Sequence, residues 1–402
     1  MISSLTSSLW SSRRSSMRLP GIYIHIPFCR TKCTYCAFNS GDFDEGLAAE
    51  YLGALKLEIA STGQRLSASG NELTIDTLYF GGGTPSILPG HQLASLIETC
   101  RENFRFAPDA EITVEINPGT LTGEKLEAYR AAGVNRASLG VQSFLDAELE
   151  SIGRVHTADQ ARAAVGELRQ SGFSNISIDL IAGLPYQSKE NWSYNLSEAI
   201  KLRPEHLSAY LLEIHSGTTL YNQVKRGLVK PIDEELAVEM YFELIDRLQG
   251  AGYEHYEISN FALKRSDNCS YRSRHNTKYW TDAPYYGFGV SAHSYDGRWR
   301  YWNVAPWRRY IELIHRNGRA VAERIEVTEE SRYQEAAFLR LRLMDGIQLS
   351  DFRSHYGVDL LERYGKEIEH LSEAGLVELG EDKLRLSRQG LVLSNEVFSV
   401  FV

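Results

Sequence analysis

The chain contains 402 residues, of which 43% are hydrophobic and 24% are charged, which is typical of a globular protein with one large and one smaller domain. A formal charge of −9 at pH 7 argues against a dominant nucleic-acid partner, because proteins that bind phosphate backbones usually carry a basic face. The sequence has no run of about 18 apolar residues, so it predicts no transmembrane helix.

The first 20 residues are rich in serine, carry three arginines and contain no acidic residue. This composition is also that of an organelle transit peptide. The alternative is a disordered extension, or a start assigned too early with Met17 opening the chain proper. We favour this alternative, because the segment is short and its amphipathicity is poor.

From residue 21 onward, short β-branched runs alternate with segments of helical periodicity such as "ADQARAAVGELRQSG". This alternation predicts an α/β fold with a parallel sheet and right-handed crossovers, either an open doubly wound sheet or an incomplete barrel. Both architectures bind ligands at the carboxyl ends of their strands. The predicted strands cover residues 21–27, 76–82, 111–117, 136–142, 175–183, 206–213 and 253–260.

The alternation of strand-like and helical segments stops after residue 260. Residues 261–315 form an aromatic-rich connecting segment, and residues 316–402 read as three helices, a hairpin and a last helix. The hairpin "LVELGEDKLRLS" turns at Gly-Glu-Asp, so the tail resembles a winged-helix domain. That pattern alone suggests DNA binding, but the acidity of the segment favours a packing or interaction role.

The stretch "CRTKCTYC" places Cys29, Cys33 and Cys36 close enough to surround one inorganic centre. A disulfide would leave one thiol over. Structural zinc needs a fourth ligand, and the nearby His25 lies within a predicted strand. An iron–sulfur cluster held by three thiolates leaves one iron free for another ligand.

The other cysteines, Cys100 and Cys269, are isolated. An odd total without a secretory signal does not predict a disulfide framework. We therefore expect a reducing compartment, the cytoplasm.

Polar or glycine-rich residues end several predicted strands. In "YFGGGTPS" the glycines either let the backbone approach a ligand or make a tight turn. Glu115, Gln142 and Asp179 interrupt apolar runs, where a buried carboxylate is costly unless it is bonded. Each is either a local cap or a ligand contact. Arg154 either binds a ligand carboxylate through two hydrogen bonds or is a solvated loop residue.

The cysteine triplet resembles the cluster motif of radical S-adenosylmethionine (SAM) proteins, and Tyr35 before Cys36 matches the aromatic residue common there. The resemblance implies a [4Fe-4S] cluster bound by Cys29, Cys33 and Cys36. The fourth iron would bind the amino and carboxylate groups of SAM, and one electron would cleave SAM to a 5′-deoxyadenosyl radical. The odd number of thiols is then explained, because the last iron is left for the cofactor.

The similarity spans nearly all of residues 20–400 and is closer to one branch, that of oxygen-independent coproporphyrinogen III oxidases and HemW-type heme chaperones. Shared phrases include "IYIHIPFC", "EINPGT", "IGRVHT" and "LSRQGLVLSNEVF". The resemblance implies a partial (β/α)6 TIM-like barrel over residues 21–260, with a C-terminal winged-helix-like domain. It implies a cofactor site formed by Tyr23, Tyr35, Gly82, Gly83, Thr84, Glu115, Gln142, Arg154 and Asp179.

Two features distinguish the chaperones from the oxidases in this branch. Phe38 stands where the bacterial oxidases carry a fourth cysteine, and "HNTKYW" resembles the chaperone signature. The resemblance therefore implies a protein that binds heme and delivers it to acceptor proteins. The alternative is an oxidoreductase that dehydrogenates coproporphyrinogen III. A third alternative, a structural cluster protein that no longer cleaves SAM, is disfavoured by the complete set of cofactor residues.

The "HNTKYW" segment predicts His275 as a candidate heme ligand, because imidazole commonly binds heme iron. In the alternative interpretation, His275 and Asn276 cap a turn and the aromatic residues fill a seam between domains. Cys269 and His293 are weaker candidates. The sequence does not identify catalytic residues or the heme acceptor, and it leaves a homodimer and covalent heme attachment open. The aromatic residues that would cover a macrocycle are Tyr279, Trp280, Tyr285, Tyr286 and Phe288.

Overall fold

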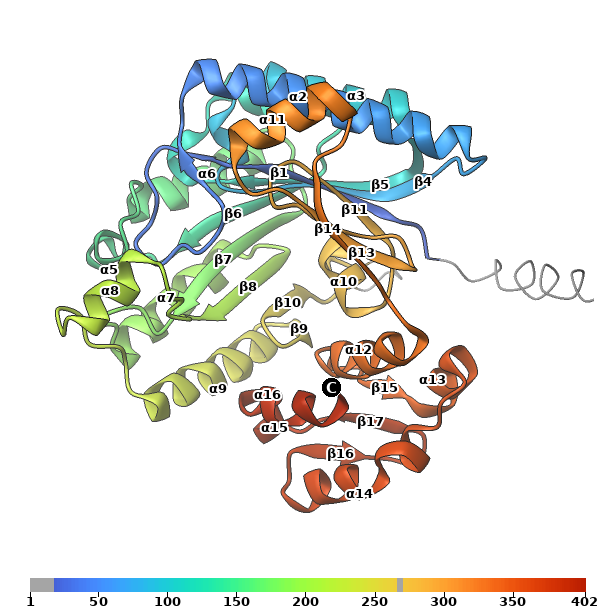
Figure 1. Ribbon diagram of the computed structural model, residues 1–402. Coiled ribbons are helices and arrows are strands. Elements are labelled where there is room, and N and C mark those ends of the chain that lie inside the picture. The colour runs from blue at the N-terminus through green and yellow to red at the C-terminus, as the bar shows by residue number, and fades with distance from the viewer. Residues whose placement is uncertain (1–17, 266–269) are drawn as a thin grey trace, which may run out of the picture.

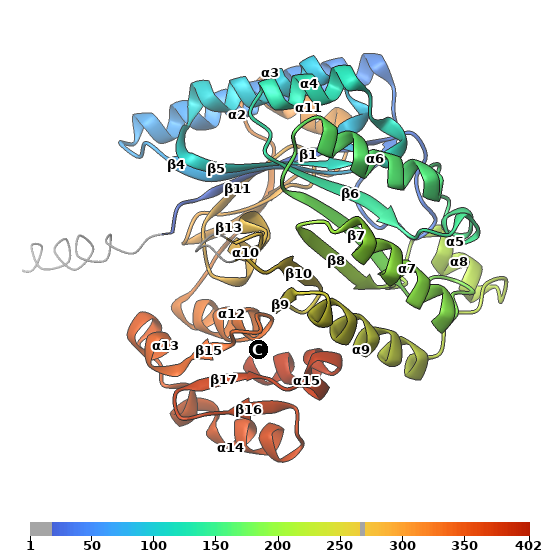
Figure 2. The ribbon, with the colours of Figure 1, turned by 180° about the vertical axis from the view of Figure 1, so that it is seen from behind.

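The computed structural model describes residues 18–265 and 270–402. Most of the predicted N-terminal extension lies outside these ranges, as does Cys269. The described chain forms one large β-sheet covered by helices, with a smaller domain below it in both views (Figures 1 and 2). No helix in these ranges is both long and apolar enough to cross a membrane.

Six parallel strands in the order β1-β4-β5-β6-β7-β8 form the centre of the large sheet. Consecutive strands are neighbours because the helix between them returns the chain to the same end of the sheet. The predicted partial (β/α)6 barrel is therefore confirmed. The strands are Gly21–Ile26 (β1), Thr74–Gly82 (β4), Arg105–Ile116 (β5), Arg136–Gln142 (β6), Ile176–Ala182 (β7) and His206–Leu211 (β8).

Helices cover the outer face of these strands (Figures 1 and 2). Ile22 and Leu78 on that face are fully buried and share one apolar core with Leu55 and Ile59 of the first helix. The helices are Glu45–Ala68 (α2), Gly90–Asn103 (α3), Gly123–Ala131 (α4), Asp146–Ser151 (α5), Ala158–Gln170 (α6), Lys189–Leu202 (α7), Thr219–Lys225 (α8) and Glu234–Gly250 (α9).

The large sheet continues beyond the parallel strands on both sides, up to twelve strands. On one side β11 pairs in parallel with β1, although more than 250 residues separate them in sequence. The sequence pattern does not predict the strands added within the connecting segment. The added elements are Tyr253–Glu257 (β9), Asn260–Leu263 (β10), Arg274–Trp280 (α10), Tyr285–Phe288 (β11), His293–Tyr295 (β12), Trp299–Asn303 (β13), Trp307–Asn317 (α11) and Val321–Glu326 (β14).

Two short strands, Phe28–Cys29 (β2) and Gly41–Asp42 (β3), pair with each other outside the large sheet, and β2 carries the first cysteine of the triplet. Short 3₁₀ helices connect other elements. They cover Pro85–Ile87, Pro118–Thr120 and Ser399–Phe401.

The C-terminal elements form the predicted winged-helix-like domain around a three-stranded sheet. The predicted hairpin is confirmed, with its turn at residues 380–382. The domain boundaries stay predictions; the large sheet runs to the end of β14, and the next helix starts at Glu329. The elements are Glu329–Leu341 (α12), Ile347–Gln348 (β15), Leu349–Tyr356 (α13), Leu360–Glu373 (α14), Val377–Leu379 (β16), Lys383–Leu386 (β17), Arg388–Val392 (α15) and Ser394–Phe398 (α16).

The C-terminal domain is docked on the barrel by polar contacts. Arg388 donates two hydrogen bonds to Asp246 of α9, at 2.7 and 2.8 Å. The backbone N–H of Met344 donates to the Tyr256 carbonyl of β9 at 3.0 Å. These contacts join the C-terminal domain to α9 and β9, and its packing or interaction role stays a prediction.

Candidate functional site

A cavity of about 470 Å³ opens at the carboxyl ends of the parallel strands. Eleven of the twelve predicted cluster and cofactor residues line it, and Tyr23 does not. They come from the cysteine loop and from β4, β5, β6 and β7 or the loops that follow them. The eleven are Cys29, Cys33, Tyr35, Cys36, Gly82, Gly83, Thr84, Glu115, Gln142, Arg154 and Asp179.

The three cysteines of the triplet are free thiols around one loop. The loop is tightened by a hydrogen bond from the Cys36 N–H to the Cys33 carbonyl, at 3.2 Å. Burial raises the pKa of the Cys29 thiol, and the Thr84 hydroxyl, 3.6 Å from its Sγ, partly offsets this. Among the described residues, no three His, Cys, Asp or Glu side chains converge as they would around a single bare ion.

Tyr35 and the loop after α5 hold the cysteine loop in place. The ring of Tyr35 packs against the buried side chains of Ile152 and Ile181. The Thr34 N–H donates to the Ile152 carbonyl at 3.0 Å. His25, the possible zinc ligand, has both ring nitrogens occupied, by the Tyr23 hydroxyl at 3.0 Å and the Asn39 carbonyl at 2.8 Å.

Glycines at the end of β4 bring the backbone close to the cysteine loop. Gly82 has a φ of +114°, which other residues rarely adopt, and a Cβ on Gly83 would lie 2.7 Å from the Phe28 carbonyl oxygen. The Gly83 N–H donates to the Ile26 carbonyl at 2.8 Å. Glycine is therefore required here because β4 approaches the protein's own backbone closely, and contact of these glycines with a ligand stays a prediction.

Two carboxylates face the cavity from β5 and β7, the strands on either side of β6. Glu115 on β5 accepts hydrogen bonds from the Tyr79 hydroxyl at 2.9 Å and the Gly82 N–H at 3.2 Å. Burial raises the pKa of Glu115 to about 7, and the charge of Asp179 adds to this. Burial also raises the pKa of Asp179, opposed by a hydrogen bond from Ser208. Such carboxylates can accept hydrogen bonds from an ammonium group.

Arg154 lies between the cysteine loop and β6. Its Nη1 is 3.7 Å from the Sγ of Cys33, its Nη2 donates to the Gly140 carbonyl, and its Nε is buried without a partner. Gln142, at the end of β6, has a φ of +67°. The free Nε leaves Arg154 able to bind an additional anion.

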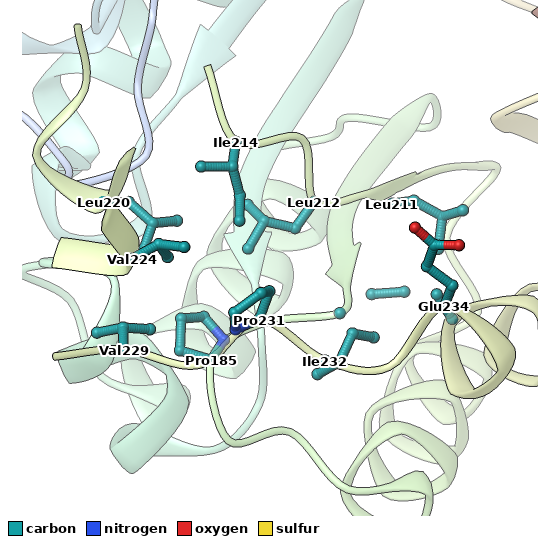
Figure 3. A pocket seen from close by; sticks show the side chains of 13 residues that line it. Pro185, Leu211, Leu212, Ile214, Leu220, Val224, Val229, Pro231, Ile232 and Glu234 are labelled. Atoms are coloured by element: carbon teal, nitrogen blue, oxygen red, sulfur yellow. The ribbon is translucent and has the colours of Figure 1, made fainter. Parts of the chain in front are cut away.

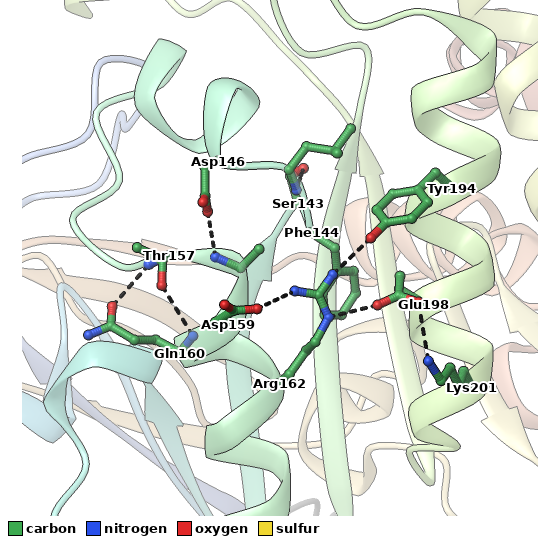
Figure 4. A network of polar contacts seen from close by, with 12 residues as sticks. Ser143, Phe144, Asp146, Thr157, Asp159, Gln160, Arg162, Tyr194, Glu198 and Lys201 are labelled. Atoms are coloured by element: carbon green, nitrogen blue, oxygen red, sulfur yellow. Dashed lines mark hydrogen bonds and ion pairs between the residues drawn. The ribbon is translucent and has the colours of Figure 1, made fainter.

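A polar network fixes the start of α6, the helix that follows Arg154 (Figure 4). Thr157 and Gln160 form a capping box, and the Ala158 N–H donates to Asp146 at 2.7 Å. Arg162 then joins α6 to Glu198 of α7 at 2.7 Å, with its guanidinium over the Phe144 ring. Both ends of the segment that carries Arg154 are thereby held.

His275 lies outside the cavity and is only 1% exposed. Its Nδ1 is 2.9 Å from the Thr77 hydroxyl and its Nε2 is 3.0 Å from the Tyr279 hydroxyl. Burial lowers the pKa of the imidazole to about 3. Neither ring nitrogen is free for heme iron in this conformation, so His275 as a ligand stays a prediction that this geometry does not support.

The rest of the "HNTKYW" segment has structural partners. Ser273, and not His275 or Asn276, caps α10, accepting from the Asn276 N–H at 3.3 Å. Lys278 is buried and pairs with Asp76 of β4 at 2.6 Å. Asn276 is the one residue of this segment that lines the cavity.

Two other candidates are not part of the cavity lining. Tyr23 stacks on Tyr79, with ring centroids 6.2 Å apart, and its contact with the cofactor stays a prediction. His293 is exposed and stacks on Trp302 at 5.3 Å.

Several lining residues were not predicted from the sequence. Arg136 and Ser138 of β6 and Ser208 and Tyr210 of β8 face the cavity, with Asn276 of α10. Arg136 could have been noticed, because it is a charged residue in an otherwise small and apolar strand. The serines and the asparagine carry no comparable signal.

A second, smaller cavity of about 160 Å³ (Figure 3) shares lining residues with the first. Leu211 and Leu212 line both, and the other side chains of its wall are mainly apolar, with the Glu234 carboxylate at one end. Leu220 in its wall donates its backbone N–H to the Thr34 carbonyl of the cysteine loop at 2.8 Å. The two cavities therefore share part of their walls, and the second is linked to the cysteine loop.

Comparisons with known proteins agree with this site. The model of the radical SAM superfamily matches residues 23–194, and the model of the HemN C-terminal domain matches residues 327–393. The chain is 38% identical over 381 residues to "Heme chaperone HemW" of Bacillus subtilis (strain 168), covering 94% of this chain and 98% of that protein.

A mitochondrial relative and a solved structure extend the comparison. The chain is 33% identical to "Radical S-adenosyl methionine domain-containing protein 1, mitochondrial" of Bos taurus, covering 92% and 85% of the two chains. The structure of coproporphyrinogen III oxidase (HemN) from Escherichia coli superposes with a TM-score of 0.83 at 26% identity, covering 98% of this chain and 93% of that one. The chain therefore belongs to the radical SAM superfamily, in the family of the HemW heme chaperones.

Proposed function

We propose that the chain is a heme chaperone, which binds heme and delivers it to acceptor proteins. The observation that carries this proposal is the similarity, over nearly the whole chain, to proteins named heme chaperone HemW. Membership of the radical SAM superfamily implies a [4Fe-4S] cluster and SAM. Heme is proposed as a further ligand, and this part of the proposal rests on the names of the relatives.

The residues that line the cavity fit the implied cluster and cofactor. Cys29, Cys33 and Cys36 would supply three thiolates, and the cluster when bound would supply one electron to SAM. The free Nε of Arg154 suits the carboxylate of an amino acid. The Glu115 carboxylate suits its ammonium group, because it can accept hydrogen bonds.

We propose the cytoplasm as the location of the protein. A mitochondrial location is the alternative, because two relatives are named as mitochondrial. The proposed partners are heme and heme-accepting proteins, without nucleic acid, which the negative net charge disfavours.

A second candidate function is the oxidation of coproporphyrinogen III. The superposition with the Escherichia coli oxidase favours it, because the two chains match over almost their whole length. Phe38 argues against it, since it stands at the mouth of the cavity where the oxidases carry a fourth cysteine, and its side chain is 67% exposed.

Titration of the cluster-loaded protein with heme tests the proposal. We expect saturable binding of one heme per chain, followed by transfer of that heme to an apoprotein such as apomyoglobin. Binding without saturation, or heme that the apoprotein does not recover, would contradict a chaperone.

The cluster has its own control in the same experiment. Cys33→Ser should lose iron, because it removes one thiolate from the loop. Cys100→Ala should keep iron, because Cys100 is buried in α3 and does not line the cavity.

A further inference from the structure

Arg136 is a buried charge without a partner. It starts β6, lines the cavity and is only 1% exposed. Its Nε is buried without a hydrogen bond, and no hydrogen bond or ion pair joins its guanidinium to any residue in the described ranges. Buried charges in folded proteins are normally paired or hydrogen-bonded, because removing them from water is costly. The exception at Arg136 therefore requires an explanation.

The two cavity carboxylates, Glu115 and Asp179, do not supply the missing partner. Glu115 is bound by Tyr79 and by the Gly82 N–H, and the hydroxyl of Ser138 contacts Asp179 at 3.4 Å. The positive charge of Arg136 lowers the pKa of both carboxyl groups, but only after the larger effects of burial and hydrogen bonding. Arg136 thus acts on these carboxylates at a distance and keeps its own donors free.

Asn276 brings a second free donor to the same cavity. It comes from α10, and its backbone N–H is the group that Ser273 caps. Within the described chain its carboxamide makes no hydrogen bond, and the residue lines the cavity together with Arg136. A guanidinium and a carboxamide can both donate hydrogen bonds to one carboxylate.

The site of these donors differs from that of Arg154. Arg154 is bound to the Gly140 carbonyl and lies against Cys33, beside the cysteine loop. Arg136 is four residues before Gly140 on the same strand, so its Cα lies about 13 Å from that of Gly140 along the strand at 3.3 Å per residue. One amino-acid carboxylate therefore does not need both arginines.

We propose that Arg136, with Asn276, binds a carboxylate of the heme that the protein carries, namely one of its propionates. This inference rests on the proposed function and names the group by which the cavity recognises its cargo. It gives the "HNTKYW" segment a role in ligand recognition through Asn276 instead of His275. The other source of the same chemistry is the carboxylate of SAM, which the experiment separates.

The test compares heme with heme dimethyl ester, in which both propionates are neutral. Both are titrated into the cluster-loaded protein in the same detergent, and SAM affinity is measured separately by equilibrium dialysis. We expect the wild type to prefer heme by about tenfold or more, the effect of one charge-assisted hydrogen-bonded contact. Arg136→Met should abolish this preference and leave the affinity for SAM unchanged.

Two further variants complete the design. Arg30→Met is the matched control, because Arg30 lines the same cavity but is exposed at its mouth. It removes one positive charge and should keep the preference for heme. If Arg136→Met does not fold, Asn276→Ala tests the same site and should reduce the preference for heme without changing the affinity for the ester.

Four results would overturn the inference. Equal losses for heme and ester in Arg136→Met would make Arg136 a structural charge. A loss of SAM affinity with unchanged heme binding would assign it to SAM. A wild type that binds heme and ester equally would leave heme binding intact but exclude propionate recognition, whereas a wild type that binds no heme would refute the proposed function as well.

Discussion

For Gly83 the structure allows the effect of a substitution on the free energy of unfolding to be predicted. We expect Gly83→Ala to destabilise the protein and to reduce cluster loading. The added Cβ would lie 2.7 Å from the Phe28 carbonyl oxygen and 3.0 Å from the Ile26 carbonyl oxygen. Both atoms belong to backbone that accepts hydrogen bonds, from Thr84 and from Gly83 itself, so neither can move alone.

Forcing a methyl group into such packed surroundings costs about 1–3 kcal/mol. The matched control is Gly166→Ala in the middle of α6, where nothing lies within 4 Å of the added Cβ. There the same substitution should stabilise by about 0.5–1 kcal/mol, because alanine favours helix. The two substitutions should therefore differ in sign.

Urea unfolding of both variants without the cluster measures the free energies, and iron analysis after reconstitution measures the loading. Gly83→Ala should lose iron, because Phe28 and Cys29 form β2 and the displaced strand carries the first thiol. If Gly83→Ala kept wild-type stability and iron content, the close approach of β4 to β2 would be refuted.

Three more predictions concern buried polar groups. Burial raises the pKa of Glu58 from 4.5 to about 7, so its contribution to folding is complete below about pH 4.5 and is lost as pH rises through 7. Glu58→Gln should reduce that slope in unfolding experiments, and an unchanged slope would exclude Glu58. Lys278→Met should cost about 1–3 kcal/mol by unfolding, because it leaves the half-buried Asp76 carboxylate without its partner; a neutral effect would contradict the pair. His275→Ala should lower the unfolding midpoint and leave the heme absorption band unchanged, whereas a shifted band would establish His275 as a ligand.

The parallel part of the fold was predictable because each strand carries its own signal. The runs at residues 136–142 and 206–213 are close to β6 and β8 as observed. The strands β11 to β14 were not predictable, because β11 is held by pairing with β1 from the far end of the sequence. Long-range pairing leaves no local pattern.

The candidate site shows the same limit. The cysteine spacing was recognisable, and Glu115 lies near the carboxyl end of β5 as predicted. Asp179 lies in the middle of β7 and not at its end, yet it lines the same cavity. The burial of His275 was not, since it depends on Thr77 and Tyr279 satisfying both ring nitrogens. The motif identified the segment, but packing decided which of its residues, Asn276, reaches the cavity.

The most direct test of the central claim is an anaerobic turnover assay. The cluster-loaded protein is given reductant, SAM and coproporphyrinogen III, and protoporphyrinogen is followed by chromatography while the same preparation is titrated with heme. The account predicts stoichiometric heme binding and no product. Multiple turnovers to protoporphyrinogen would contradict it and make this chain a porphyrin-oxidising enzyme.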